Sequence, residues 1–136
     1  MAVSKSERLP VRSSEDVVLV RQRVRALAQE IGFSLVDQTK IVTAASEIAR
    51  NTINYGGGGA AVLEYINEDM RRGLRLVFED QGPGIPDIAL ALKDGYTSGS
   101  GLGLGLGGAK RLSNEFDIWS KVGEGTRVSL TRWKQI

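Results

Sequence analysis

The sequence predicts an α+β fold: a two-layer α/β sandwich with helices on one face of a mostly antiparallel mixed sheet. The first observation is the order of periodic segments, which is strand, two helices, two strands, a glycine-rich region with a helix, and two strands. The second is a pair of capping signals, Ser13 with Asp16 and Ser34 with Asp37, each before an amphipathic helical pattern. At 136 residues the chain suits a single domain, expected over residues 1–136.

Each element has its own local signal. Residues 1–7 are expected to be a frayed lead-in, and the alternation around Pro10 predicts a short edge strand. The first helix should end at Gly32, and the second near Tyr55, before a run of four glycines. The other elements are expected as strands at 60–67 and 73–79, a short helix at 86–93, a helix at about 104–114, and strands near 116–122 and 126–133.

Composition narrows the chemistry. The chain contains no cysteine and no histidine, which excludes disulfides, thiol and imidazole catalysis, and nearly all transition-metal sites. A bound cation would be a hard one with oxygen ligands, such as Mg²⁺. The net charge is only +2 and the basic residues are scattered, so no nucleic-acid partner is expected. No apolar run reaches the roughly 20 residues that span a bilayer, so we expect no membrane association and a cytoplasmic location.

A polar stripe marks the second predicted helix. Glu47, Asn51 and Asn54 lie three and four residues apart, so their side chains project from one face. A carboxylate and amides on one face can hold an oxygen-liganded cation or position a hydroxyl for deprotonation. Such a stripe alone is more often a solvated surface, but this one precedes a glycine loop and two further glycine motifs.

Two glycine-rich motifs follow. Asp80 stands between a strand and the turn Gln81-Gly82-Pro83-Gly84, where glycines allow a flat ring to approach and the carboxylate can accept from an amine such as that of adenine. The run from Gly99 to Gly108 leads into a helical pattern, and backbone amides at a helix start favour phosphate. Taken alone, an aspartate before a glycine turn is more often a plain turn than a site, and a glycine run is more often a flexible linker. The run is not a dinucleotide-binding fingerprint, because no hydrophobic strand precedes it. It is not a Walker A loop either, because it lacks Gly-Lys followed by Ser or Thr.

Taken in order, these motifs resemble those of the GHKL (Bergerat-fold) ATPases and kinases. Glu47-x-x-x-Asn51 resembles the N box, Asp80-Gln81-Gly82-Pro83-Gly84 the G1 box, Gly99-x-Gly101-Leu102-Gly103-Leu104 the G2 box, and Gly125-Thr126 the final element. The chain is too short for the gyrase, chaperone or mismatch-repair branches, and it lacks the histidine of sensor kinases. Segments 80–88 and 110–116 are most similar to switch kinases of the RsbT type, among the small bacterial serine kinases and anti-sigma factors.

This resemblance implies an ATP- and Mg²⁺-dependent serine/threonine-protein kinase. Glu47 would be the general base, Asn51 the Mg²⁺ ligand, and Asp80 the partner of the adenine amine. Gly84 would pack beside the ring and Thr126 would assist near the base. The other implied ATP contacts are Gly82, Gly99, Gly101, Leu102, Gly103, Leu104 and Gly105. Some relatives carry an arginine in the glycine-rich lid; here Ser98 and Ser100 stand instead, and Lys110 or Arg111 could substitute.

The resemblance also implies partners. They would be STAS-domain proteins of the stressosome, RsbS- and RsbR-like, whose phosphorylation releases the kinase to a downstream phosphatase or other effector. Two alternatives stay open: an RsbW-like anti-sigma factor that sequesters a sigma factor and phosphorylates its antagonist, and a nucleotide-binding scaffold without catalysis. The cluster Arg21, Arg23 and Arg25 could dock an acidic partner, although a solvated helix face is the commoner reading.

Overall fold

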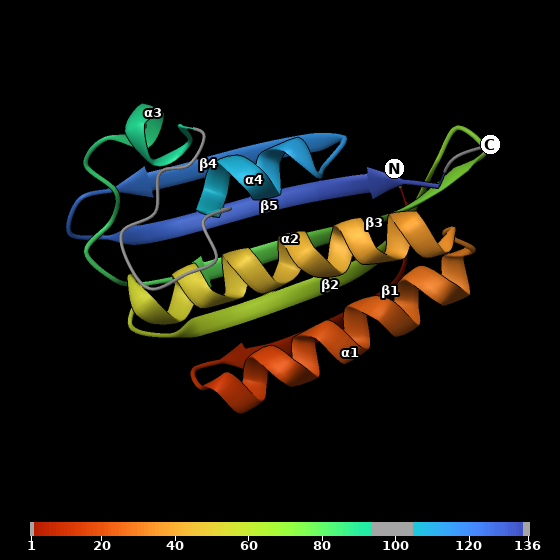
Figure 1. The fold of residues 1–136 in the computed structure, drawn as a ribbon, viewed down its shortest axis with the longest axis horizontal. Helices are drawn as coiled ribbons and strands as arrows, with labels where there is room; N and C mark the ends of the chain where they lie inside the picture. Colours follow the sequence, from red (N-terminus) through yellow and green to blue (C-terminus); the bar gives the residue numbers. More distant parts are fainter. Residues whose placement is uncertain (1, 94–104, 135–136) are drawn as a thin grey trace.

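A computed structural model describes residues 2–93 and 105–134 and shows the two predicted layers (Figure 1). The five-stranded sheet has the order β1-β2-β3-β5-β4. Its strands are β1 (Ala2–Val11), β2 (Gly59–Glu68), β3 (Arg71–Asp80), β4 (Glu115–Lys121) and β5 (Gly125–Trp133). The helices are α1 (Ser14–Ile31), α2 (Leu35–Asn54), α3 (Ile88–Ala91) and α4 (Gly105–Arg111). The α+β sandwich is confirmed, with every pairing between these strands antiparallel rather than mixed.

The two long helices begin and end where their caps predict. The Ser13 hydroxyl accepts from the Asp16 amide at 3.3 Å, and the Ser34 hydroxyl accepts from the Asp37 amide at 3.1 Å. Helix α1 stops at Gly32, whose φ of 102° lies in the left-handed region that glycine adopts without penalty. None of the helices in the described part of the chain is long and apolar enough to cross a membrane.

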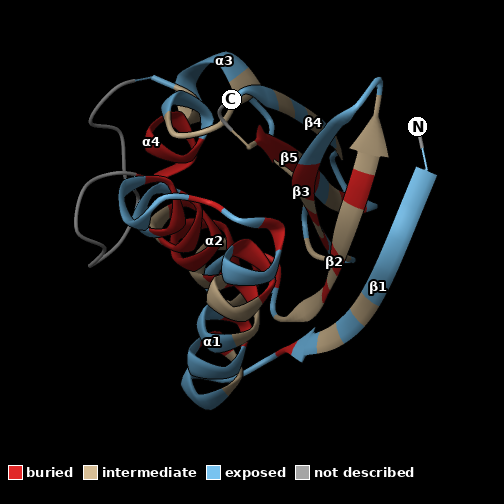
Figure 2. Ribbon diagram, turned by 90° about the vertical axis from the view of Figure 1, so that its right-hand side faces the viewer, coloured by how far each residue is buried: buried red, intermediate tan, exposed pale blue. Residues whose placement is uncertain are grey.

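One hydrophobic core joins the layers. Figure 2 shows the helices on one side of the sheet, with most of α2 buried and β1 largely exposed. The largest fully buried side chains come from both layers and include Val20, Val24, Ile31, Ile41, Ile48, Leu63, Leu74, Leu76, Phe78 and Leu130. The polar side chains of α2 that are buried in this core, Glu47 among them, are confined by the close packing around them.

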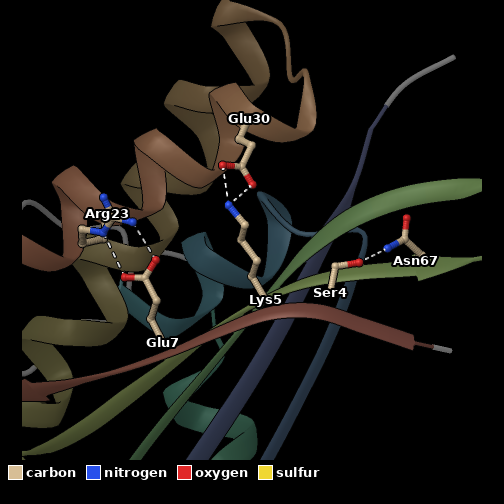
Figure 3. Close-up of polar contacts among 6 residues, drawn as sticks. All are labelled: Ser4, Lys5, Glu7, Arg23, Glu30 and Asn67. Atoms are coloured by element: carbon tan, nitrogen blue, oxygen red, sulfur yellow. Dashed lines mark hydrogen bonds and ion pairs between the residues drawn. The ribbon is translucent and has the colours of Figure 1, made fainter.

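Strand β1 corrects one expectation. Residues 2–7 are not a frayed lead-in, because they pair with β2 along the edge of the sheet. Their side chains also reach α1: Lys5 pairs with Glu30 at 2.8 Å, and Arg23 holds Glu7 through two hydrogen bonds of 2.9 and 2.7 Å (Figure 3). These partners lie 25 and 16 residues away, so the local pattern of residues 1–7 could not reveal them.

The hairpin between β2 and β3 turns through two residues. Asp69 and Met70 have φ values of 49° and 71°, and two successive positive angles are typical of the tight turns that match the twist of a hairpin. The Met70 side chain is fully exposed at the tip. The turn therefore fixes the register that carries β3 toward Asp80 at its other end.

Candidate functional site

A cavity of about 450 Å³ lies between the second half of α2, the ends of β3 and β5, and the segment leading into α3. The residues expected in a nucleotide site that line it are Glu47, Asn51, Asp80, Gly84, Gly105 and Thr126. Gly82 lies beside the cavity rather than in its lining. The expected residues Gly99, Gly101, Leu102, Gly103 and Leu104 fall outside the described residues.

Glu47 is a buried carboxylate in the lining of this cavity, only 6% exposed. Its Oε1 accepts from Nη1 of Arg50 at 3.1 Å, and its Oε2 accepts from the Gly105 amide at 3.2 Å. A buried charge requires such partners, and the bond from Gly105 also connects α2 to the start of α4. Asn51, one turn further along α2, is half-buried and lines the same cavity.

Asp80 lines the same cavity where β3 ends, next to Gly56, which follows α2 nine residues after Glu47. Its Oδ1 accepts from the Gly82 amide at 2.9 Å, and the Thr126 amide is a second donor. Burial raises the pKa of Asp80 above its ordinary value, and the two amides offset this only in part. A ligand that donates a further hydrogen bond would favour the ionised form, so the carboxylate suits an amine-bearing group.

Glycines surround Asp80 because backbone passes too close for side chains. A Cβ on Gly56 would overlap the Asp80 carboxylate, and one on Gly82 would lie 2.6 Å from the Cα of Gly56. Gly84 has a φ of 80°, and a Cβ there would overlap the Lys121 carbonyl oxygen. These glycines let three chain segments pack together around Asp80, which itself lines the cavity.

Ser120 is a functional candidate that sequence reasoning missed. Its hydroxyl accepts from the Ile85 amide at 2.7 Å, donates to the Gly125 carbonyl at 3.0 Å, and lies 2.8 Å from Oγ1 of Thr126. It therefore ties the loop after Asp80 to β5 and orients Thr126. A serine in a plain alternating strand gives no signal of such a role.

Arg50 is a second missed residue. It stands directly before Asn51, and it is the sole lysine or arginine among the described residues that line the cavity. The expected substitutes Lys110 and Arg111 are exposed at the end of α4 and are absent from that lining. The three-residue spacing from Glu47 was the available signal, because side chains at that spacing meet on a helix.

The oxygen atoms that line the cavity are suitable ligands for a magnesium ion whose other ligands are water and substrate phosphate. Within residues 2–93 and 105–134, no three carboxylates gather into a closed metal site. Mg²⁺ usually takes one or two protein ligands and completes its shell with water and substrate phosphates. The amide of Asn51, one helical turn from the Glu47 carboxylate in the same lining, fits that pattern.

Residues 11–132 match the histidine kinase-like ATPase domain, so the match spans nearly the whole chain. The chain belongs to this family. A member from Bacillus subtilis (strain 168), the serine/threonine-protein kinase RsbT, is 47% identical over 118 residues, which cover 87% of this chain and 89% of the relative. That similarity confirms the expected relation to RsbT-type kinases and the expected enzyme class, a serine/threonine-protein kinase.

More distant family members include anti-sigma factors. An anti-sigma F factor of Clostridium kluyveri is 27% identical over 126 residues, covering 90% of this chain and 89% of that protein. Among solved structures, the RsbU and RsbW domains of a Mycobacterium tuberculosis protein align over 98% of this chain and 34% of theirs, with a TM-score of 0.67 and 22% identity. The mycobacterial sensor histidine kinase MprB aligns over 97% of this chain and 100% of its own, with a TM-score of 0.57 and 20% identity. These structures confirm the fold of the family.

Proposed function

We propose that this chain is an ATP- and Mg²⁺-dependent kinase that phosphorylates serine or threonine on RsbS- and RsbR-like STAS-domain proteins of a cytoplasmic stressosome. Phosphorylation then releases it to a downstream phosphatase or other effector. The observation that carries the proposal is one cavity lined by both the buried carboxylate of Glu47 and the carboxylate of Asp80. The 47% identical relative that is a serine/threonine-protein kinase supports the class of reaction.

Glu47 serves as the base in this proposal. Its carboxylate takes the proton of the acceptor hydroxyl while that oxygen bonds to the γ-phosphorus of ATP, and the bond from this phosphorus to the bridging oxygen breaks, releasing ADP. The Asn51 amide oxygen would hold Mg²⁺, which would neutralise phosphate charge. The burial of Glu47 and the hydrogen bond from the Gly105 amide to Oε2 hold the carboxylate in place for this step.

Asp80 anchors the adenine in this proposal. The exocyclic amine donates to its carboxylate, Gly84 packs beside the ring, and Gly82 supports Asp80 through its amide. Thr126 assists from β5, held by Ser120. The lid contacts assigned to Gly99, Gly101, Leu102, Gly103, Leu104 and Gly105 stay part of the proposal on sequence resemblance, together with the Gly105 amide that reaches Glu47.

The test is phosphoryl transfer from labelled ATP, with Mg²⁺, to candidate STAS-domain proteins. We expect label on a serine or threonine of at least one of them. Binding of ATP without transfer to any such protein would favour the scaffold alternative. The anti-sigma alternative is favoured by the anti-sigma F relatives, and stable ATP-dependent capture of a sigma factor in a pull-down would overturn the switch-kinase proposal.

Replacing Asp80 with asparagine should separate ligand binding from stability. Burial raises the Asp80 pKa, so the folded protein holds that proton more tightly than the unfolded chain, and stability falls as the pH rises from the ordinary aspartate pKa through the raised one. At neutral pH we therefore expect Asp80→Asn to leave the ligand-free melting temperature unchanged or higher. ATP affinity should fall, because the amide is a weaker acceptor. Equal ATP affinity by calorimetry would refute the adenine role.

A further inference from the structure

We propose that Arg50 is a phosphate-binding residue that exchanges partners during the reaction. In the structure its guanidinium pairs with Glu47, and when ATP binds it turns to the transferred phosphoryl group. That exchange frees Oε1 of Glu47 to take the proton of the acceptor hydroxyl. The inference rests on the kinase function proposed above and adds the cation that this function requires.

The geometry of the pair favours movement of the arginine. Nη1 of Arg50 lies 3.1 Å from Oε1 of Glu47, and the arginine side chain is 38% exposed against 8% for the glutamate. Glu47 is also held at Oε2 by the Gly105 amide. Within the described residues the guanidinium donates only this one hydrogen bond to protein, although an arginine carries five N–H groups. The glutamate is therefore the fixed member of the pair, and the arginine has further N–H groups that can bind phosphate oxygens.

Most of the charged side chains that line the cavity are negative, so binding of a triphosphate requires a positively charged side chain. The lining contains the carboxylates of Glu47, Asp80 and Asp87, and among the described residues Arg50 is its lone cation. A nucleoside triphosphate adds further negative charge, and phosphoryl transfer depends on neutralising that charge around the moving group. Lys110 and Arg111 are exposed on α4 and outside the lining, so Arg50 is the cation already in place.

Position along α2 identifies which phosphate Arg50 would contact. A general base must lie within hydrogen-bond reach of the hydroxyl that attacks phosphorus, so the transferred phosphoryl lies next to Glu47. A guanidinium paired with that base neighbours the same group, and its planar fork matches phosphate oxygens. Asp80 is remote from Glu47, because it lies against Gly56 after the end of α2 and the helix rises on the order of 10 Å between Glu47 and Asn54. Arg50 should therefore contact the γ-phosphate and make no contact with the adenosine part of ATP.

The test compares ATP with ADP by titration calorimetry in MgCl₂. We expect Arg50→Ala to lower ATP affinity by about 10-fold to 100-fold, the range for one hydrogen bond to a charged group, and to leave ADP affinity close to wild type. Arg50→Lys keeps the positive charge but lacks the planar guanidinium, so its ATP affinity should lie between those of the wild type and Arg50→Ala. The matched control is Arg21→Ala, an exposed arginine on α1, which should bind both nucleotides as the wild type does.

Transfer kinetics add a second measurement. At saturating ATP, single-turnover transfer by Arg50→Ala should be slower by about 10²-fold to 10³-fold, with partial recovery in Arg50→Lys. A purely structural role predicts instead that ATP and ADP affinities fall together with the melting temperature. That result, or an unchanged ATP affinity in Arg50→Ala, would overturn the proposal. If the wild type binds ATP but phosphorylates no STAS protein, the ATP-to-ADP comparison still decides the role of Arg50.

Discussion

Replacing Glu47 with glutamine is expected to slow phosphoryl transfer by about 10²-fold to 10⁴-fold, the contribution of a well-placed base, while ATP affinity stays close to wild type. The amide has the shape of the carboxylate and can still accept from the Gly105 amide through its oxygen. It cannot take a proton from the acceptor hydroxyl. Single-turnover transfer measures the loss, and calorimetry measures the affinity.

Glu30→Gln is the control for this change, because Glu30 is an exposed glutamate whose partner is Lys5 on β1, away from the cavity. Its transfer rate should equal that of the wild type. If Glu47→Gln transfers phosphate as fast as the wild type, the assignment of Glu47 as the base is wrong. If it loses ATP binding as well as transfer, Glu47 acts mainly in holding the site together.

Asp37→Ala is expected to lower the free energy of unfolding by about 3–5 kcal/mol, the usual effect of removing one member of a buried ion pair. Oδ1 of Asp37 accepts from Nη2 of Arg132 at 2.6 Å, and the two side chains are 10% and 9% exposed. Arg132 also donates to the Leu112 carbonyl at 2.8 Å, and its Nε has no partner among the described residues. Without Asp37 the guanidinium would be buried with one acceptor.

The same pair gives a pH dependence. The Arg132 hydrogen bond lowers the Asp37 pKa, against the opposing effect of burial. The unfolded chain therefore binds this proton more tightly, so the contribution of the pair is complete above the ordinary aspartate pKa and is lost as the pH falls through the lowered one. Urea unfolding at neutral and acidic pH measures both effects. Glu30→Ala removes an exposed pair worth up to about 1 kcal/mol; equal losses in the two variants would contradict the prediction.

Helix ends could be predicted from the sequence because their signals are local. The hydroxyl of a capping serine accepts a hydrogen bond from an amide only three residues away. Gly32 ends α1 because its own backbone adopts the left-handed conformation. Strand β1 could not be predicted at its full length, since the charged residues Lys5 and Glu7 are stabilised by α1. The buried pair of Asp37 and Arg132 joins residues 95 positions apart, and no local pattern connects them.

The site divides in the same way. Glu47, Asn51 and Asp80 belong to spaced motifs, so their gathering around one cavity could be anticipated. Ser120 could not be anticipated, because its contacts form only after folding, and the spacing of Arg50 from Glu47 is enough to predict their pairing but not that Arg50 lines the cavity. Ser120 meets a loop 35 residues earlier in the chain, and Arg50 matters through the cavity that it lines.

The exposed tip of the β2–β3 hairpin offers a place for chemical labelling. Met70 is fully exposed, and the ten residues from it to Asp80 span about 33 Å of extended strand. Since the chain has no cysteine, Met70→Cys would supply its single thiol. A dye attached there would report tumbling and assembly without obstructing the cavity. A linker at the same atom would immobilise the protein with the cavity facing away from the support.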